Sequence, residues 1–533
     1  MTLSSALSNA LIYLTMIAFL FVGIYAGFTK TKNKQDFLSS IGTQTALALA
    51  ANWFASTATS LYPTGDSDLG SSVLYAYPEV GTLAGLLGVF WYAFGSTVPL
   101  WIFAWLGPMM RRKCPEGFTL TTFILERFGR INQIYISLMS MAYMFCYMVS
   151  ELSAVGAILN YLTNLDPLVP TIMIALTTTI YTAYGGFRAS LLTDSVQGWA
   201  IIILLVISAI GFGVDVKIDT SKIGPSHLLE SNTLGWELAW IMPIAVTFAN
   251  LFHEGYWQRT FASKNDRELV LSTVYGSIML FPTLFIIGFT GMIAYWAGTW
   301  TDDGSNPGYL AFFTLFSLLP DWVVAFVVIL TVSLSCSAYD TLQSAMVATM
   351  SNDLFNNKLP LIAIRALTLI FNIPAVWLGL KNLDVLEVFL IGDLLAAAAM
   401  PPVLLGLADS LYFLNWCDAL IGGIGGMFSV FATGAIYYNS ASSGINLILL
   451  PDGLYSNDYS VLIAFIAAPF GAVFFTFFSF ALRLGGMYIW ALIKGQSFEF
   501  PKRKEKNVEE EESRFEKENS NVVIDDSENR NIV

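Results

Sequence analysis

Residues 321–349 of the chain read DWVVAFVVILTVSLSCSAYDTLQSAMVAT, and this stretch decides the fold class. Its first half is almost continuously apolar, and the whole stretch contains no Lys or Arg. A bilayer hydrocarbon core of about 30 Å is crossed by roughly 20 helical residues. The stretch is therefore long enough to span a bilayer as a single helix, and we predict a transmembrane helix here.

Similar runs recur along most of the 533 residues. They are long and continuously apolar, whereas the strands of a membrane barrel would show short alternating segments. We predict an all-α polytopic membrane protein with about 13 spans. The predicted spans are residues 8–28, 43–77, 80–107, 132–161, 166–184, 193–214, 236–252, 270–297, 321–349, 360–380, 384–407, 418–438 and 461–490.

The composition supports this prediction. Hydrophobic residues make up 55% of the chain and charged residues only 12%, about half the charged fraction of an ordinary soluble domain. The net charge of −13 argues against binding to nucleic acid. The four cysteines show neither metal-ligand spacing nor a disulfide framework, so we predict no metal and no other cofactor.

The distribution of basic residues predicts the orientation. Loops that would face the cytosol carry most of the Lys and Arg, whereas the loops at 298–320 and 439–460 carry none. By the positive-inside rule, the N-terminus is outside and the C-terminus is cytosolic. The outer loop with Lys217 and Lys222 departs from this pattern. The inner basic residues include Lys30, Lys32, Lys34, Arg111, Arg112, Lys113, Arg127, Arg130, Arg188, Arg259, Lys264, Arg267 and Lys358.

Acidic side chains at membrane depth are costly and are therefore candidates for function. Glu151 lies well inside the fourth run, Asp340 in the ninth and Asp393 in the eleventh. Such a carboxyl group can bind a cationic solute, exchange a proton, or make a purely structural hydrogen bond between helices. The small hydroxyl residues around Asp340, including Ser337, suit either cation binding or close helix packing.

The second run is interrupted by Pro63, Gly65 and Gly70, and again by Pro78 and Gly81. A broken helix exposes backbone carbonyls and helix ends near the midplane, where transporters place substrates and ions. A long, discontinuous span of this kind favours a transporter over a receptor.

Residues 181–197, YTAYGGFRASLLTDSVQ, resemble the sodium:solute symporter family, which carries a Gly-Gly turn, a basic residue and a Thr-Asp-x-x-Gln start to its next helix. The nearest resemblance within the family is to the fungal urea active transporters, which move urea and polyamines with protons. Supporting segments are FWYAFGSTV (90–98), RRKCP (111–115) leading to ERFG (126–129), and GYWQR (255–259). The resemblance covers about residues 40–410.

The resemblance implies a core of two inverted five-helix repeats with a broken first core helix. It also implies four parts of the chain: an extra helix and basic loop at 1–40, the symporter core at 41–410, further transmembrane helices at 411–495, and a disordered cytosolic tail at 496–533. The tail is charged and of low complexity, which by itself predicts disorder.

The resemblance also implies site residues. The family's sodium site uses the broken first core helix, where we place Leu69, and a hydroxyl pair on the eighth core helix, matched here by Ser337 and Ala338. Ala338 has no hydroxyl and Leu334 replaces the usual small residue, so the pattern favours protons over sodium. Ion-coupling candidates are therefore Leu69, Asp194, Ser337, Ala338 and Asp340. Substrate candidates are Trp91, Tyr92, Glu151, Glu254 and Asp393.

About a dozen residues, Thr57 to Asp68, are extra relative to the family spacing. Two interpretations stay open. The residues form a real loop at the ion site, with Asp66 or Asp68 as a new carboxylate, or they reflect a gene-model error such as retained intron sequence.

The function that we expect is a secondary active symporter in the plasma membrane, importing a small nitrogenous solute such as urea or a polyamine with protons. One alternative is a symporter of the same fold for proline, a vitamin or a sugar. Another is a non-transporting nutrient sensor. We do not expect an enzyme, because no nucleophile motif stands out. The sequence leaves the oligomeric state open.

Overall fold

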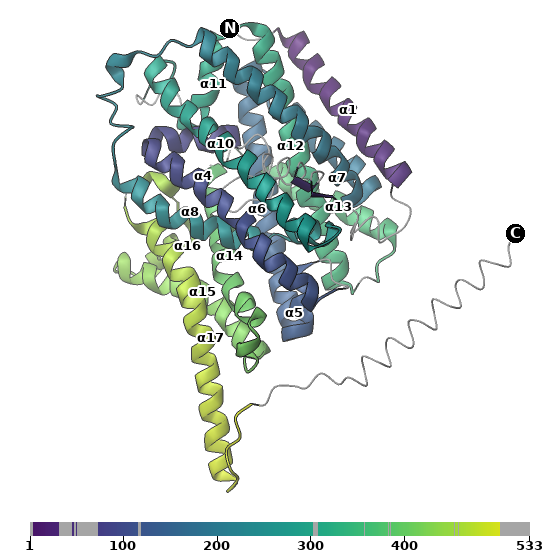
Figure 1. Cartoon of the computed structure of the whole chain (residues 1–533), viewed down its shortest axis with the longest axis vertical. Coiled ribbons are helices and arrows are strands. Elements are labelled where there is room, and N and C mark those ends of the chain that lie inside the picture. Colours follow the sequence, from purple (N-terminus) through teal and green to yellow (C-terminus); the bar gives the residue numbers. More distant parts are fainter. Residues whose placement is uncertain are drawn as a thin grey trace, which may run out of the picture.

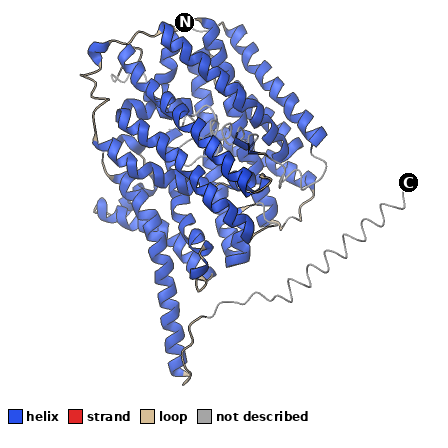
Figure 2. Cartoon of the chain, in the orientation of Figure 1, coloured by secondary structure: helices blue, strands red, loops and turns tan. Residues whose placement is uncertain are grey.

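The computed structural model describes residues 4–30, 45–46, 49–50, 73–115, 119–301, 307–356, 358–381, 383, 385–451, 453–456 and 458–501. This part of the chain is all-α, with no β-strand (Figure 2). The predicted all-α class is therefore confirmed. The predicted tail after residue 501, the extra segment Thr57 to Asp68 and Leu69 lie outside the described residues.

The principal helices of the described residues follow one another along the chain. They are α1 (Ser5–Lys30), α4 (Val73–Lys113), α5 (Leu120–Phe128), α6 (Arg130–Thr163), α7 (Leu168–Asp215), α8 (Thr233–Phe252), α9 (Glu254–Ala262), α10 (Asp266–Ala297), α11 (Ala311–Leu315), α12 (Asp321–Thr349), α13 (Leu361–Gly379), α14 (Val385–Leu407), α15 (Trp416–Tyr437), α16 (Asn446–Leu449) and α17 (Ser460–Ile493). A π-helical turn, η4 (Met350–Leu354), extends α12.

Within the described residues, 11 helices are long and apolar enough to cross a membrane, as an integral membrane protein requires. The sequence predicted the runs at 166–184 and 193–214 as separate helices. In the structure they lie on two helical segments of α7, separated at Gly186, whose φ 60° and ψ −155° are not helical. A positive φ of this kind costs little for glycine. The predicted span 43–77 lies mostly outside the described residues.

Burial separates the central helices from peripheral ones such as α1, which lies at the edge of the bundle (Figure 1). The most apolar windows of α6 and α12 are each 78% buried, whereas those of α1 and α13 are only 24% and 28% buried. Helix α12 packs against both α6 and α7, and α14 packs against α6. Helices α15 and α17 pair at another edge, where α17 extends beyond the rest of the bundle. The centre is therefore formed by α6, α12 and α14.

Helix α8 ends at Phe252, where the predicted span 236–252 ends, but the short helix α9 that follows was not predicted from the sequence. His253 leaves the helical conformation, with φ −78° and ψ 118°, and its Nδ1 accepts a hydrogen bond of 2.9 Å from the Gly255 backbone N–H. The ring thus satisfies a backbone donor at the start of α9. The break brings backbone ends and a fully buried ring into the interior of the bundle.

Helices α4 and α10 pack with their backbones in close approach, which glycines permit. A Cβ atom added at Gly291 would lie 1.9 Å from the carbonyl oxygen of Pro78, and one at Gly81 would lie 2.3 Å from the carbonyl oxygen of Gly288. No side-chain rotation relieves a clash with backbone, so the two helices would have to separate. The small residues therefore set the distance between α4 and α10.

We expect Gly291→Ala to lower the free energy of unfolding by about 1 to 3 kcal/mol, because it overpacks this contact. The measurement is thermal unfolding of the purified variant in mild detergent. Gly485→Ala is the matched control, since a Cβ atom there meets nothing within 4 Å. Equal melting curves for the two variants would contradict the close α4–α10 contact.

Candidate functional site

One face of α6 carries the polar and aromatic groups of the candidate site. Tyr143, Tyr147 and Glu151 follow at intervals of four residues, so they lie above one another on the helix. All three are buried, with at most 1% of each side chain exposed. The face turns towards α12 and α14, which pack on α6.

Glu151 contacts α12. Its Oε1 accepts a hydrogen bond of 2.6 Å from the hydroxyl of Ser335. The structure thus places this predicted substrate residue at the centre of the bundle, at the crossing of α6 and α12. A carboxyl group there is poised to meet a cationic group or to exchange a proton.

Asp393 contacts the same face of α6 from α14. The hydroxyl of Tyr147 donates a hydrogen bond to its Oδ1. Its other oxygen, Oδ2, is buried and has no hydrogen-bond partner in the part of the chain that the structure describes. A buried oxygen without a donor is costly. It is therefore available to a solute that brings one.

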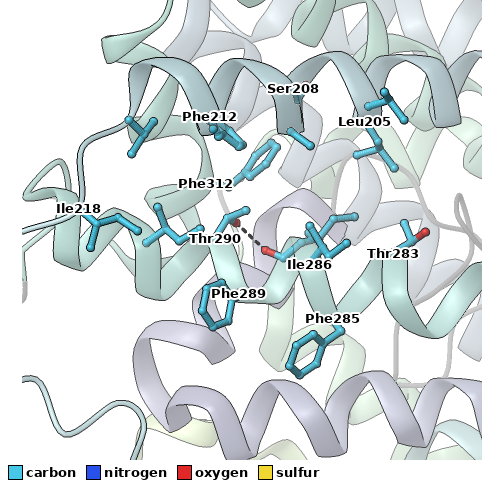
Figure 3. A pocket seen from close by; sticks show the side chains of 16 residues that line it. Leu205, Ser208, Phe212, Ile218, Thr283, Phe285, Ile286, Phe289, Thr290 and Phe312 are labelled. Carbon is cyan, nitrogen blue, oxygen red and sulfur yellow. Dashed lines mark hydrogen bonds between the residues drawn. The ribbon is translucent and has the colours of Figure 1, made fainter. Parts of the chain in front are cut away.

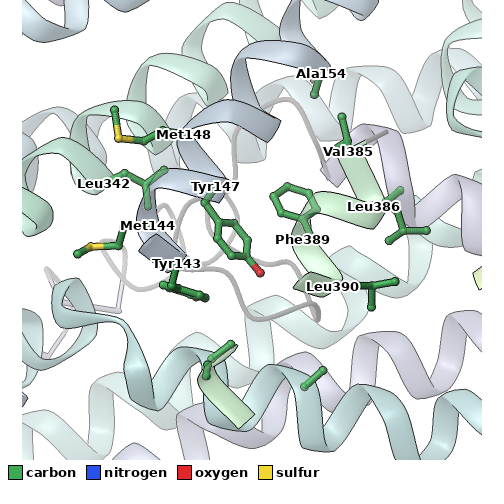
Figure 4. Packing of buried hydrophobic residues seen from close by; sticks show 14 of the residues in the cluster. Tyr143, Met144, Tyr147, Met148, Ala154, Leu342, Val385, Leu386, Phe389 and Leu390 are labelled. Carbon is green, nitrogen blue, oxygen red and sulfur yellow. The ribbon is translucent and has the colours of Figure 1, made fainter. Parts of the chain in front are cut away.

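Aromatic rings surround this carboxylate. The ring of Tyr147 stacks on Phe389 with centroids 4.7 Å apart and packs against Tyr143 at the same separation (Figure 4). Tyr143 in turn contacts the His253 ring, with centroids 6.1 Å apart. A continuous aromatic group thus joins α14 and α6 to the break between α8 and α9. Aromatic faces attract cations.

Asp340 lies in a different environment, between α12 and α7. It is fully buried and accepts hydrogen bonds from the hydroxyls of Tyr181 (2.6 Å), Ser190 (2.7 Å), Thr193 (3.1 Å) and Thr341 (3.3 Å). These donors compensate for the lost hydration of the carboxylate. The same contacts tie α7 to α12, so Asp340 links the two helices.

The structure describes the side chains of only some of the remaining ion-coupling candidates. Ser337 and Ala338 lie buried on α12, one turn or less from Asp340. Asp194 belongs to α7, but its side chain is outside what the structure describes, and Leu69 is outside it altogether. The role of this set in ion coupling stays a prediction. Among the described residues, no three His, Cys, Asp or Glu side chains come together as a metal site would require.

Glu254 does not join the Glu151–Asp393 group. It starts α9, where its Oε2 accepts a hydrogen bond of 2.9 Å from the backbone N–H of Leu120 at the start of α5. The Glu254 side chain is fully buried. Its hydrogen bond to Leu120 suits a role in holding α5 and α9 together.

Trp91 and Tyr92 belong to an aromatic group on α4. Tyr92 is fully buried and stacks on Tyr77 with centroids 4.2 Å apart. The Tyr77 hydroxyl in turn lies 2.8 Å from that of Ser96. Trp91 packs edge-on against Phe90 and Phe94. These contacts are what a packed helix interface requires, and the substrate role of Trp91 and Tyr92 stays a prediction.

Sequence reasoning missed Tyr147, Tyr143 and His253 as parts of the site. The signal for the two tyrosines was present, because both lie at four-residue intervals from Glu151. The contact with Asp393 was not predictable, because it depends on how α14 packs against α6.

Solved structures show the same fold. A sodium-coupled sialic acid symporter in its substrate-bound outward-open state aligns with a TM-score of 0.65 at 16% identity, covering 88% of this chain and 98% of that one. Mhp1, a nucleobase-cation-symport-1 family transporter in a closed conformation, aligns with a TM-score of 0.52 at 13% identity, covering 84% of this chain and 96% of that one.

Sequence comparison is more specific. The chain is 42% identical over 499 residues to the spermidine transporter DUR31 of Candida albicans, covering 93% of each chain. It is 24% identical over 230 residues to the probable urea active transporter 1 of Schizosaccharomyces pombe, covering 39% of this chain and 34% of that protein. The model of the sodium:solute symporter family matches residues 52–426. This match spans most of the membrane-embedded helices, and the chain belongs to the sodium:solute symporter family.

Proposed function

We propose that the chain is a secondary active symporter that imports a polyamine such as spermidine. The observation that carries the proposal is the buried carboxylate of Asp393, whose Oδ2 has no hydrogen-bond partner within the described part of the chain. It lies beside stacked aromatic rings, and Glu151 follows Tyr147 by one turn of α6. Carboxylates and aromatic faces together suit ammonium groups.

The relatives support a nitrogenous solute, and the extent of each match favours spermidine over urea. The spermidine transporter matches over nearly its whole length, whereas the urea transporters match over at most 34% of theirs. Urea is the second candidate. It is neutral, so it needs hydrogen-bonding groups but not two carboxylates. The pair of carboxylates on α6 and α14 therefore favours the polyamine.

We propose protons as the coupling ion. A dehydrated sodium ion needs several oxygen ligands, and α12 presents the methyl group of Ala338 and the side chain of Leu334 where the family uses a hydroxyl and a small residue. Both side chains are buried. The interior carboxyl groups offer sites for a proton instead.

The proposed architecture has thirteen spans with two inverted repeats. A helix over 43–77 and the second half of α7 add to the 11 spans found among the described residues. The first repeat would run from the 43–77 helix to α7, and the second from α8 to α14. The break at His253 then falls in the first helix of its repeat. An experimental structure of the whole chain tests this arrangement. The two repeats should be related by a two-fold axis in the membrane plane, and any other rotation between them would contradict the proposal.

The proposed location is the plasma membrane, with the C-terminus and the Arg111–Arg130 loop in the cytosol, because basic residues gather there. We expect an epitope placed after Asn529 to resist protease in sealed right-side-out vesicles. Cleavage of that epitope from the outside, while the vesicles remain sealed, would contradict the topology.

Uptake in a transporter-deficient host tests the function. We expect saturable uptake of radiolabelled spermidine, faster at acidic than at neutral external pH, abolished by a protonophore and unchanged when sodium is replaced. Urea and proline are measured in parallel. Saturable activation by sodium at fixed pH would overturn proton coupling, and faster uptake of proline than of spermidine or urea would overturn the substrate class.

A further inference from the structure

A second cavity lies apart from the carboxylate site, between α7 and α10. It has a volume of about 630 Å³, and Phe312 from α11 also lines it. Figure 3 shows Leu205 and Phe212 of α7 facing Ile286 and Thr290 of α10 across it. We call this cavity the α7–α10 groove. Its size is that of a ligand site.

The lining of the groove is apolar. Its hydroxyl side chains are those of Ser208, Thr283 and Thr290. The two threonines use their hydroxyls on their own helix: Thr283 donates to the carbonyl of Met279 at 2.8 Å and Thr290 to that of Ile287 at 2.5 Å. A urea or polyamine molecule would lose its hydration here without gaining comparable partners. The occupant must therefore be apolar where it contacts the groove.

The groove opens sideways on the surface of the bundle. Among its lining residues, Val206 is 52% and Ile286 57% exposed, and the neighbouring Ile210 is 62% exposed. Helix α10 is one of the membrane spans, so this surface meets hydrocarbon. If the cavity were empty, the side chains that line it would lack dispersion contacts on the side that faces it. A lipid chain that enters from the side restores them.

The end of α7 provides polar groups at one end of the groove. Lys217 lies between the lining residues Val216 and Ile218, and it makes no ion pair among the described residues. Asp215 and Asp219 lie two positions to either side, and all three are exposed. Both signs of charge are thus presented together. This mixture complements a headgroup that carries a phosphate and an ammonium. A sterol has only a hydroxyl, which would leave these charged side chains without a partner of opposite charge.

We propose that the α7–α10 groove binds a zwitterionic phospholipid. One acyl chain fills the groove, the phosphate lies beside Lys217, and the headgroup ammonium lies beside the aspartates. This explains why a lysine is placed on the side of the membrane where the chain otherwise carries few basic residues. The site involves neither Glu151 nor Asp393, so it is independent of the transported solute.

Photocrosslinking of the full-length chain tests the proposal. The chain is reconstituted in phosphatidylcholine vesicles that contain a small fraction of phosphatidylcholine with a diazirine at the acyl end. After irradiation, we expect adducts concentrated on peptides covering 205–218 and 283–293. Adducts no denser there than on the exposed faces of α1 and α13 would overturn the proposal. A photoactivatable sterol that labels these peptides in place of the phospholipid would overturn it too.

Two variants with matched controls sharpen the test. Gly213→Phe places a ring in the groove, where a Cβ atom meets nothing within 4 Å, and Gly485→Phe adds the same ring on α17 in equally open space. We expect the first to lower labelling several-fold and the second to leave it unchanged. Lys217→Gln should weaken labelling, whereas Lys381→Gln, on another loop, should not. Equal labelling of Lys217→Gln and wild type would overturn the headgroup contact.

Discussion

Glu151→Gln is expected to lower the initial rate of spermidine uptake about tenfold or more, while the amount of protein at the cell surface stays at the wild-type level. A tenfold loss corresponds to about 1.4 kcal/mol. Glutamine keeps the shape of the side chain and can still accept the 2.6 Å hydrogen bond from Ser335. It cannot bind a proton in the same way, and it carries no negative charge for an ammonium group.

Glu230→Gln is the matched control for this substitution, because the Glu230 side chain is 66% exposed and lies outside the site. Surface biotinylation and initial uptake are measured on the same cells. If Glu151 only hydrogen-bonds to α12, the Gln variant will transport as the wild type does. That result would remove Glu151 from the site.

Asp393→Asn is expected to raise the KM for spermidine about tenfold or more, since a hydrogen bond to a charged group contributes about 1.5 to 3 kcal/mol. The Asn carbonyl can still accept the hydrogen bond from Tyr147. An NH₂ group, however, replaces Oδ2, and it cannot accept from an ammonium. The measurement is uptake at a series of spermidine concentrations, with surface abundance determined in parallel.

Tyr147→Phe distinguishes the role of the charge from that of its hydrogen bond. It removes the donor to Oδ1 but leaves the carboxylate and the ring stacked on Phe389. We expect a smaller change in KM than for Asp393→Asn. An unchanged KM in the Asn variant, at normal abundance, would show that Asp393 does not contact the solute.

The sequence predicted most of the helices because lipid imposes a simple rule. A chain that crosses hydrocarbon must satisfy its own backbone groups, and a long apolar run can do this only as a helix. The run at 321–349 became α12 with the same limits. The runs at 166–184 and 193–214 were predicted as separate helices, and α7 is indeed divided at Gly186, which is not helical.

The candidate site was less predictable. Glu151 and Asp393 could be chosen from the sequence because a carboxyl group in an apolar run is costly wherever the helix packs. The predictions could not show that Tyr147 joins them, because that contact depends on the packing of α14 against α6. The short helix α9 after His253 was also missed. A histidine ring that caps α9 leaves no signal in hydropathy.

Transport by the purified chain in proteoliposomes tests the central claim most directly. The vesicles are loaded with a near-neutral buffer and diluted into an acidic one, and the initial uptake of radiolabelled spermidine is measured with and without sodium. We predict uptake well above that of empty vesicles, driven by the pH gradient and indifferent to sodium. Uptake equal to that of empty vesicles in every condition, or uptake that a sodium gradient drives without a pH gradient, would contradict a proton-coupled polyamine symporter.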